Sequence, residues 1–359
     1  MKIRKILFAL CFSFLVSSAF AETFEERVAA AKETAGTALS NVMESALNEF
    51  EVLLPESNSL MGVQPDAFIG NIFPALPPHF AVGINGGITL VKSEFITDSV
   101  DKLSSSISEM LTALSALDTS LEGSLSGLNF DINLPDSLPY PAASVSARVG
   151  GVILPFDVGL WAVTTGNIFK DKSFGKGPTL DFAYTQFGAD LRYAILKGDG
   201  LFPKFTIGGG YQFVNQNIGL NFTKDFEISQ NYEEAKFRGS ANVTTDANLK
   251  INTHTFFGEL QVSKTLLIFT PYVGLKAFFT TADCEYDWKY DTYAQGQHVD
   301  ALSDSGKNSY RHTISDVGIG SQIFGGLGLN LAFFQTSFNA SYNLNSKHFS
   351  ASLGTNFKL

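Results

Sequence analysis

The sequence predicts an all-β fold, an antiparallel transmembrane β-barrel of about ten strands within a range of about 8–12. Three observations predict it. The chain begins with an export signal, its apolar residues are spread by two-residue alternation, and long and short connections follow one another. Alternating segments of about ten residues are the signature of strands that face lipid on one side.

The first element is a secretory signal peptide over residues 1–21. A basic start, MKIRK, precedes an apolar run over residues 6–16 and the small-residue stretch Ala19-Phe20-Ala21. This order of charge, apolar run and small residues predicts cleavage after Ala21 and export of the mature chain. A lipoprotein signal fits less well, because Cys11 lies too early and follows Leu10.

Composition excludes several classes of function. Cleavage removes three positive charges, so the formal net charge of −10 becomes −13. Nucleic-acid binding requires clustered Lys and Arg, so no such partner is predicted. Cys284 is then the one remaining cysteine, which excludes an intramolecular disulfide, and no Cys/His spacing suits structural zinc. No cofactor is predicted. No later apolar run reaches the roughly 18 residues of a spanning helix.

Residues 22–78 are predicted to form a periplasmic or plugging helical segment that precedes the barrel. A helix is expected over 24–53, because apolar residues recur there at steps of three and four. Five prolines between 55 and 78 break any helix or central strand and predict a linker. The helical stripe consists of Val28, Ala31, Ala35, Leu39, Val42, Ala46, Phe50 and Leu53.

Residues 79–359 are predicted to form the barrel, because segments with one apolar and one polar side recur along them. A soluble β-sandwich is the competing interpretation. It is disfavoured because the polar side is rich in Gly, Ser, Thr, Asn and Gln and carries few charges, as a small lumen would. The predicted strands cover 80–91, 143–149, 156–163, 187–195, 205–213, 255–263, 269–279, 321–332, 334–344 and 348–359.

The connections between these strands predict the orientation. Short turns on one rim and long loops on the other are typical of outer-membrane barrels, whose long loops lie outside the cell. The short connection at 345–347 is the exception. The long connections are 93–141, 167–178, 215–253 and 282–315, and the short ones lie near 150–155, 197–203, 264–269 and 332–334.

The last strand, HFSASLGTNFKL, resembles the terminal strand of bacterial outer-membrane β-barrel proteins. Their assembly signal is matched by Gly354, Phe357 and Leu359, although a final Phe is the commoner form. The resemblance implies outer-membrane lipid and the barrel-assembly machinery as partners, and pairing of this strand with the first. A segment before the first strand is similar to long-chain fatty-acid transporters, but their Asn-Pro-Ala motif is absent.

Charged residues on the polar side of the strands are the candidate lumen-lining residues. A ring of such charges could select solutes by charge and size. Alternatively, they pair with one another inside a narrow, filled barrel, because buried charges require partners. The bulk of Trp161 and Lys276 favours the filled barrel. The candidates are Arg148, Asp157, Asp190, Arg192, Glu259 and Lys276.

Two long connections carry other patterns. DCEYDWKYDTY, residues 283–293, interleaves carboxylates with aromatic residues, which could bind a cation, a sugar or a host surface; a soluble acidic loop is the preferred interpretation. The first long connection carries a narrow helical seam over 97–121, expected to cap or plug the barrel. The seam consists of Val100, Leu103, Ile107, Met110, Leu114, Leu117 and Leu121.

These patterns predict an outer-membrane barrel that acts as a small pore or transporter for small or amphipathic solutes. The alternative is a surface-exposed structural or adhesive protein without transport. Enzyme activity is not expected, because no Ser/His/Asp signature surrounds the five histidines; His298 or His312 beside a carboxylate in a rim cleft would favour it. No catalytic, cofactor-binding or metal-ligating residue is predicted.

Overall fold

The computed structural model describes residues 63–70, 79–92, 137–151, 154–164, 169–173, 179–198, 201–232, 235–294, 297–298, 303–313, 320–345 and 347–359, together with Glu33, Thr37 and Ser40. The predicted signal peptide and the predicted helix at 97–121 lie outside these residues. So does the predicted helix at 24–53, apart from the three single residues, which are helical. No helix among the described residues is long and apolar enough to cross a membrane.

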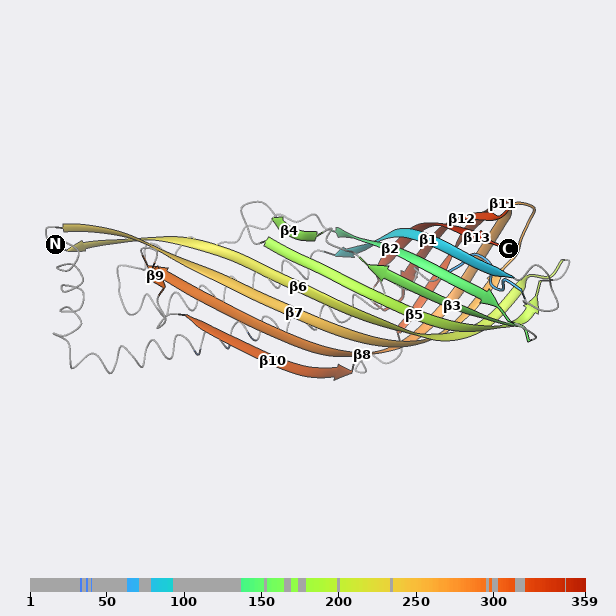
Figure 1. Cartoon of the computed structure of the whole chain (residues 1–359), viewed down its shortest axis with the longest axis horizontal. Coiled ribbons are helices and arrows are strands. Elements are labelled where there is room, and N and C mark those ends of the chain that lie inside the picture. Colours follow the sequence, from blue (N-terminus) through green and yellow to red (C-terminus); the bar gives the residue numbers. More distant parts are fainter. Residues whose placement is uncertain are drawn as a thin grey trace.

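Ten antiparallel strands close into a barrel, as the sequence predicts (Figure 1). They are β1 (Phe80–Lys92), β2 (Ser137–Gly150), β3 (Phe156–Thr164), β5 (Thr179–Lys197), β6 (Lys204–Tyr232), β7 (Ala235–Ser263), β8 (Phe269–Ala294), β11 (Gly320–Leu331), β12 (Phe334–Asn343) and β13 (Phe349–Lys358). Each pairs with the next in this order, and β13 pairs with β1.

Three short strands lengthen this wall: β4 (Phe169–Ser173), β9 (Gln297–His298) and β10 (Asp304–Thr313). β4 pairs with β5 above β3, β10 pairs with β8 above β11, and β9 pairs with the end of β8. Four short connections, the end of β13 and the start of β1 lie at one end of the barrel, which we call the short-turn end. The other end is called the extension end.

The barrel closes between β1 and β13. Phe80 N donates to Leu359 O at 2.9 Å, and Leu359 N donates to Phe80 O at 3.0 Å. The register then continues from Ala81 opposite Lys358 to Leu90 opposite Phe349. The expected pairing of the last strand with the first is therefore confirmed. Neither strand leaves unpaired backbone groups facing lipid, which could not hydrogen-bond them.

Two reciprocal Asn–Gly pairs fill the inner side of this closing seam. Asn85 lies opposite Gly354, and Asn356 lies opposite Gly83. A Cβ atom on either glycine would lie 1.8 Å from the Oδ1 atom of the facing asparagine. Both glycines are therefore needed so that a buried asparagine can lie flat across the seam.

Within the barrel wall the apolar side chains face outward. Outward residues such as Ile84, Val145 and Leu353 are 58–65% exposed, while their inward neighbours such as Asn85 and Ser144 are buried. A continuous belt of exposed aliphatic and aromatic side chains is stable only in a hydrocarbon environment. The short-turn half of the barrel thus spans a membrane. Aromatic residues mark its rim, where Phe357 contacts the rings of Phe80, Phe333 and Phe334.

β6, β7 and β8 continue far beyond this belt (Figure 1). They contain 29, 29 and 26 residues, which at about 3.3 Å per residue is roughly three times the hydrocarbon thickness of a membrane. The prediction of long loops at 215–253 and 282–315 was therefore wrong over most of their length. We call the part of β6–β8 beyond the belt the extension.

The polarity of the wall inverts in the extension. On β8 the outward residues change from Val273 and Leu275 to Glu285 and Asp287, while the inward residues change from Lys276 to apolar and aromatic ones. The acidic-aromatic segment at 283–293 is thus strand, with its carboxylates outside. A search for strands with an outward apolar side overlooks it. The two-residue alternation continues there, but the apolar residues lie on the inward side and the polar ones on the outward side. Gln216 and Thr253 are buried on this inward side as well. The buried apolar inward residues of the extension are Val214, Ile218, Ala247, Leu249, Ile251, Ala282, Cys284, Tyr286 and Trp288.

The seam makes a testable prediction. Gly354→Ala should destabilise the folded barrel by about 1–3 kcal/mol, because its methyl group displaces Asn85. Gly86→Ala, on the same strand pair but with nothing within 4 Å of its Cβ position, is the matched control and should be neutral. Urea unfolding and the heat-modifiable folded band measure both. Asn85→Ala should remove most of the cost of Gly354→Ala; full additivity of the two costs would contradict the account.

Candidate functional site

Four of the predicted lumen charges form one ion-paired layer. Arg148 contacts Asp157 at 2.7 Å and Asp190 at 2.6 Å, and Arg192 contacts Asp157 at 2.8 Å. All four side chains are buried. Their charges offset one another across β2, β3 and β5, so this layer presents little net charge to a passing solute.

The layer lies along the wall because glycines beneath it leave room. A Cβ atom on Gly159 would lie 2.4 Å from the Arg148 guanidinium, and one on Gly208 would lie 2.8 Å from Arg192 Cγ. Over Gly208, Arg192 Nη1 reaches across β6 and donates to Gln261 Oε1 at 2.9 Å. The two arginines therefore follow the inner surface and do not fill the centre of the lumen.

The other two predicted lumen residues form a second pair. Lys276 Nζ lies 3.6 Å from Glu259 Oε2, and both side chains are buried. The same ammonium lies 4.4 Å from the centroid of the Phe257 ring and 5.9 Å from that of Phe324. Trp161 is also buried and packs against Phe257. All six sequence-predicted residues thus lie inside the barrel in ion pairs.

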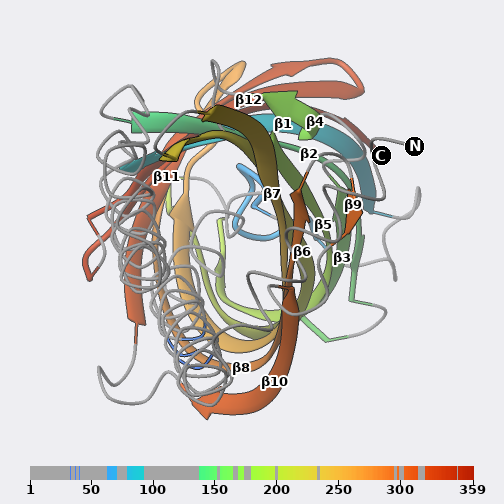
Figure 2. The ribbon, with the colours of Figure 1, turned by 90° about the vertical axis from the view of Figure 1, so that its left-hand side faces the viewer.

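A separate segment, residues 63–70, occupies the centre at the short-turn end, inside the ring of strands (Figure 2). Ala67 N donates to Ser263 Oγ at 2.9 Å, and Ile69 N donates to Asp157 Oδ2 at 3.2 Å. Gln261 Nε2 donates to the carbonyl of Gln64 at 2.7 Å. We call residues 63–70 the lumen segment. The sequence places it in a proline-rich linker, and nothing in that pattern predicts its contacts.

Asp66 is the main anchor of the lumen segment. Its carboxylate accepts from Lys204 Nζ at 3.1 Å, from Lys358 Nζ at 2.7 Å and from Gln335 Nε2 at 3.1 Å. Burial alone would raise the pKa of Asp66, but the charges and hydrogen bonds of the two lysines outweigh burial and lower that pKa to about 2. One carboxylate therefore connects β6, β12 and β13 across the lumen.

The lumen segment contacts strands around most of the barrel. Besides these three strands it contacts β3 through Asp157, β7 through Ser263, and β8 and β11 through a buried cluster of Val63, Tyr272 and Phe324. Tyr272 in turn donates to Asn339 on β12. These eight residues thus contact seven of the ten strands, through polar contacts and through the buried side chains of Val63, Ala67 and Phe68.

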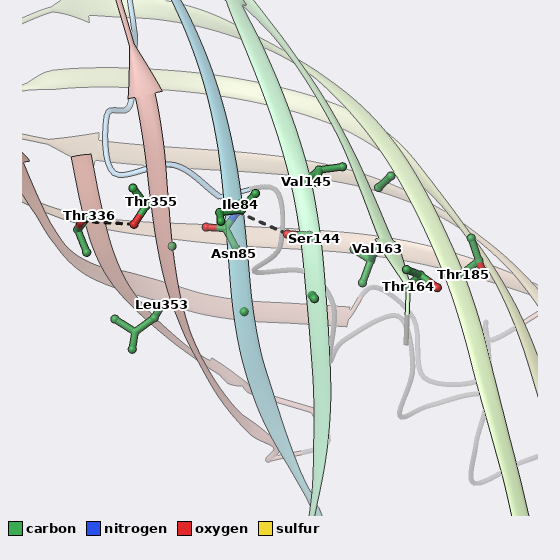
Figure 3. A pocket seen from close by; sticks show the side chains of 14 residues that line it. Ile84, Asn85, Ser144, Val145, Val163, Thr164, Thr185, Thr336, Leu353 and Thr355 are labelled. Atoms are coloured by element: carbon green, nitrogen blue, oxygen red, sulfur yellow. Dashed lines mark hydrogen bonds between the residues drawn. The ribbon is translucent and has the colours of Figure 1, made fainter. Parts of the chain in front are cut away.

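A groove on the described surface faces the membrane. It has a volume of about 810 Å³ and lies over the seam, from β12 and β13 across β1, β2 and β3 to β5 (Figure 3). Outward residues such as Ile84, Val145 and Leu353 border it, and Gly86 and Ala143 leave the depression between them. The groove therefore belongs to the lipid-facing surface and not to the lumen.

One histidine meets part of the condition for catalysis. His298 Nε2 lies 3.0 Å from Asp291 Oδ1 and 3.1 Å from Ser303 Oγ. A relay needs the carboxylate on one ring nitrogen and the hydroxyl on the other, whereas both contact the same nitrogen here. The side chain is exposed on β9, beside the end of β8, and does not line the groove over the seam. Among the described residues no group of three or more potential ligands could hold a metal ion.

Comparisons with known proteins find distant structural likeness. No family model and no curated protein matches the chain. The translocator domain of autotransporter NalP from Neisseria meningitidis is similar at 7% identity and a TM-score of 0.30, covering 80% of this chain and 91% of its own. The Ralstonia pickettii toluene transporter TbuX is similar at 8% identity and 0.27, covering 84% and 97%. A major outer membrane protein from Thermus thermophilus is similar at 8% identity and a TM-score of 0.27, covering 78% of this chain and 99% of its own.

The anchor makes a pH-dependent prediction. The pKa of Asp66, about 2, lies below the ordinary 3.8, so its ionised form stabilises docking by roughly 2 kcal/mol. This contribution is complete above about pH 4 and is lost as the pH falls through 2. Hydrogen–deuterium exchange at Ala67 and Ile69, corrected for intrinsic rates, should accelerate over that window. Asp66→Asn should exchange faster at neutral pH and lack the Asp66-dependent acid step; an identical step in the variant would contradict the assignment.

Proposed function

We propose that the protein is an outer-membrane barrel that admits small amphipathic solutes through a lumen closed at rest. The predicted signal peptide and the apolar belt support an outer-membrane location. The short-turn end, where β1 starts and β13 ends, then faces the periplasm, and the extension faces outward. Outer-membrane lipid and, during biogenesis, the barrel-assembly machinery are the proposed partners. We propose no enzymatic activity.

The observation that supports this proposal is that a separate segment, residues 63–70, lies inside the lumen and contacts the surrounding strands. The ion-paired layer follows the wall over Gly159 and Gly208, so the lumen segment is what fills the centre at the short-turn end. The contacts that hold this segment include the polar ones around Asp66, which water or a local change in charge can replace. A barrel closed in this way can open without breaking its wall.

The lining of the lumen suits an amphipathic solute. Above the charged layer it changes to neutral amides, where Gln186 Nε2 donates to Gln212 Oε1 at 3.3 Å. Gln216, two positions further along β6 from Val214, is fully buried, and neither atom of its amide has a hydrogen-bond partner in the described protein. Apolar side chains lie on the same face at Val214 and Ile218. The route therefore offers hydrogen bonds and apolar contact together.

Conductance tests the proposal. Purified wild-type protein in planar bilayers should be closed most of the time, because the lumen segment stays docked. Asp66→Asn should raise the frequency of conductance steps and the flux of small amphipathic solutes into liposomes several-fold. Asp287→Asn, which removes an exposed outward carboxylate of the extension, is the matched control and should behave as wild type.

The second candidate is a surface-exposed structural or adhesive protein. The observation that favours it is the extension itself, whose outward side is polar and whose height far exceeds what spanning requires. The same recordings separate the two. If neither Asp66→Asn nor replacement of residues 64–69 by a Gly-Ser sequence opens the barrel, transport is contradicted and the surface role stands.

A further inference from the structure

The lumen segment has a direction. Gly70 lies against His79 at the short-turn rim, and Ala67 bonds Ser263, the last residue of β7. Gln64 bonds Gln261, two residues deeper on β7, and Val63 packs against Phe324 deeper still on β11. Followed from residue 70 to residue 63, the chain therefore rises from the rim into the lumen. The residues before Val63 start from inside the barrel and head toward the extension end.

The extension offers those residues an apolar surface. Its inward side chains are buried, with Ile251 at 0%, Cys284 at 1% and Tyr286 at 2% exposure, although they lie beyond the membrane-spanning wall. The outward residues of the same strands, such as Lys250 and Glu285, are exposed and polar. A sheet with one polar and one apolar side in an aqueous setting must cover the apolar one. We call this inward surface the apolar face.

The N-terminal stripe at 28–53 has the matching pattern. Glu33 and Thr37, two of the three described residues in this region, are helical and exposed. At 100° per residue they lie opposite the apolar stripe of that helix. The third, Ser40, lies on the same side and is half-buried, so the described residues of the helix all belong to its polar side.

The distances agree with a connection between the two. Tyr272 beside Val63 and Cys284 on the apolar face are twelve positions apart on β8, about 40 Å along the strand and roughly 28 Å along a barrel axis at a tilt of about 45°. The ten steps from residue 63 back to 53 can span about 33 Å when extended. Residues 54–62 are therefore long enough to bring Leu53 and Phe50 to the level of Cys284.

The lengths agree as well. A helix over 28–53 is about 38 Å long at 1.5 Å per residue. β7 continues for sixteen residues from Ile251 to Ala235, about 53 Å along the strand and roughly 37 Å along the same tilted axis. The helix is thus about as long as the part of β7 beyond Ile251, on which Ala247 and Leu249 are the described buried apolar residues.

We propose that the mature N-terminal segment threads the lumen from the short-turn end and docks its apolar stripe, residues 28–53, on the apolar face of the extension. The occupant of this face is thus the protein's own N-terminal helix, placed outside the membrane and joined to the lumen segment through residues 54–62. This goes beyond the proposed function. Because the apolar face includes Val214 and Ile218 of the proposed solute route, transport then requires the helix to leave this face as well. The helical seam predicted at 97–121, which follows β1 at the extension end, is the competing occupant.

Disulfide cross-linking to Cys284 tests the proposal in the full-length protein, since Cys284 is the one cysteine outside the signal peptide. Cysteines are placed singly at Phe50 and Leu53 on the stripe. Asn48→Cys and Glu51→Cys, at the same level on the opposite side of the helix, are the matched controls. After oxidation and cleavage at a protease site inserted in 54–62, a cross-linked N-terminal fragment stays attached until reduced.

Phe50→Cys or Leu53→Cys should cross-link at least fivefold more than Asn48→Cys or Glu51→Cys in the heat-modifiable, folded fraction. Equal yields on both sides of the helix, or no cross-link at any of the four, would overturn the proposal. Cross-linking from Leu114→Cys or Leu117→Cys instead would assign the face to the helical seam at 97–121. If a variant fails to fold, the same scan is run against Ala282→Cys in a Cys284→Ser background, where the neighbouring inward position serves as the second anchor.

Discussion

The structure depends on one constraint: in lipid, every backbone N–H and C=O must be hydrogen-bonded within the protein. The ring of ten strands meets it, and the seam between β1 and β13 is where it is completed. The reciprocal Asn–Gly pairs follow from this closure. Two strands brought together at a narrow radius leave room for one large polar side chain per pair, so each asparagine lies over a glycine.

The surrounding medium then fixes the polarity of each part of the wall. Where lipid surrounds the barrel, the outward side is apolar and the inside is filled by ion pairs and amides, including the Arg148–Asp157–Arg192 layer. Where water surrounds the extension, the outward side is polar and the apolar side chains turn inward. The same strands serve both regions because a register with two-residue alternation keeps each side continuous across the boundary.

Residue patterns predict the membrane-spanning half well because one medium acts on every strand there. Alternation placed all ten strands, and it placed the side chains of Arg148 and Glu259 on the inward side. The extension was missed because its alternation carries the opposite sign, as in Asp283, Cys284 and Glu285. The lumen segment was missed for another reason: its contacts join Asp66 to Lys358, 292 positions away, and no local pattern encodes such a pairing.

The change of polarity along β8 offers the most direct test of this account, because the polarity of the outward side chains alone predicts where the membrane boundary lies. Spin labels placed singly at outward positions from Val273 to Asp287 can be compared for collision with oxygen, which partitions into lipid, and with a water-soluble nickel complex. The account predicts that oxygen dominates at 273–279 and nickel at 285 and 287, with the crossover near 281–283. Oxygen dominance through Asp287, or nickel dominance already at Leu275, would contradict it.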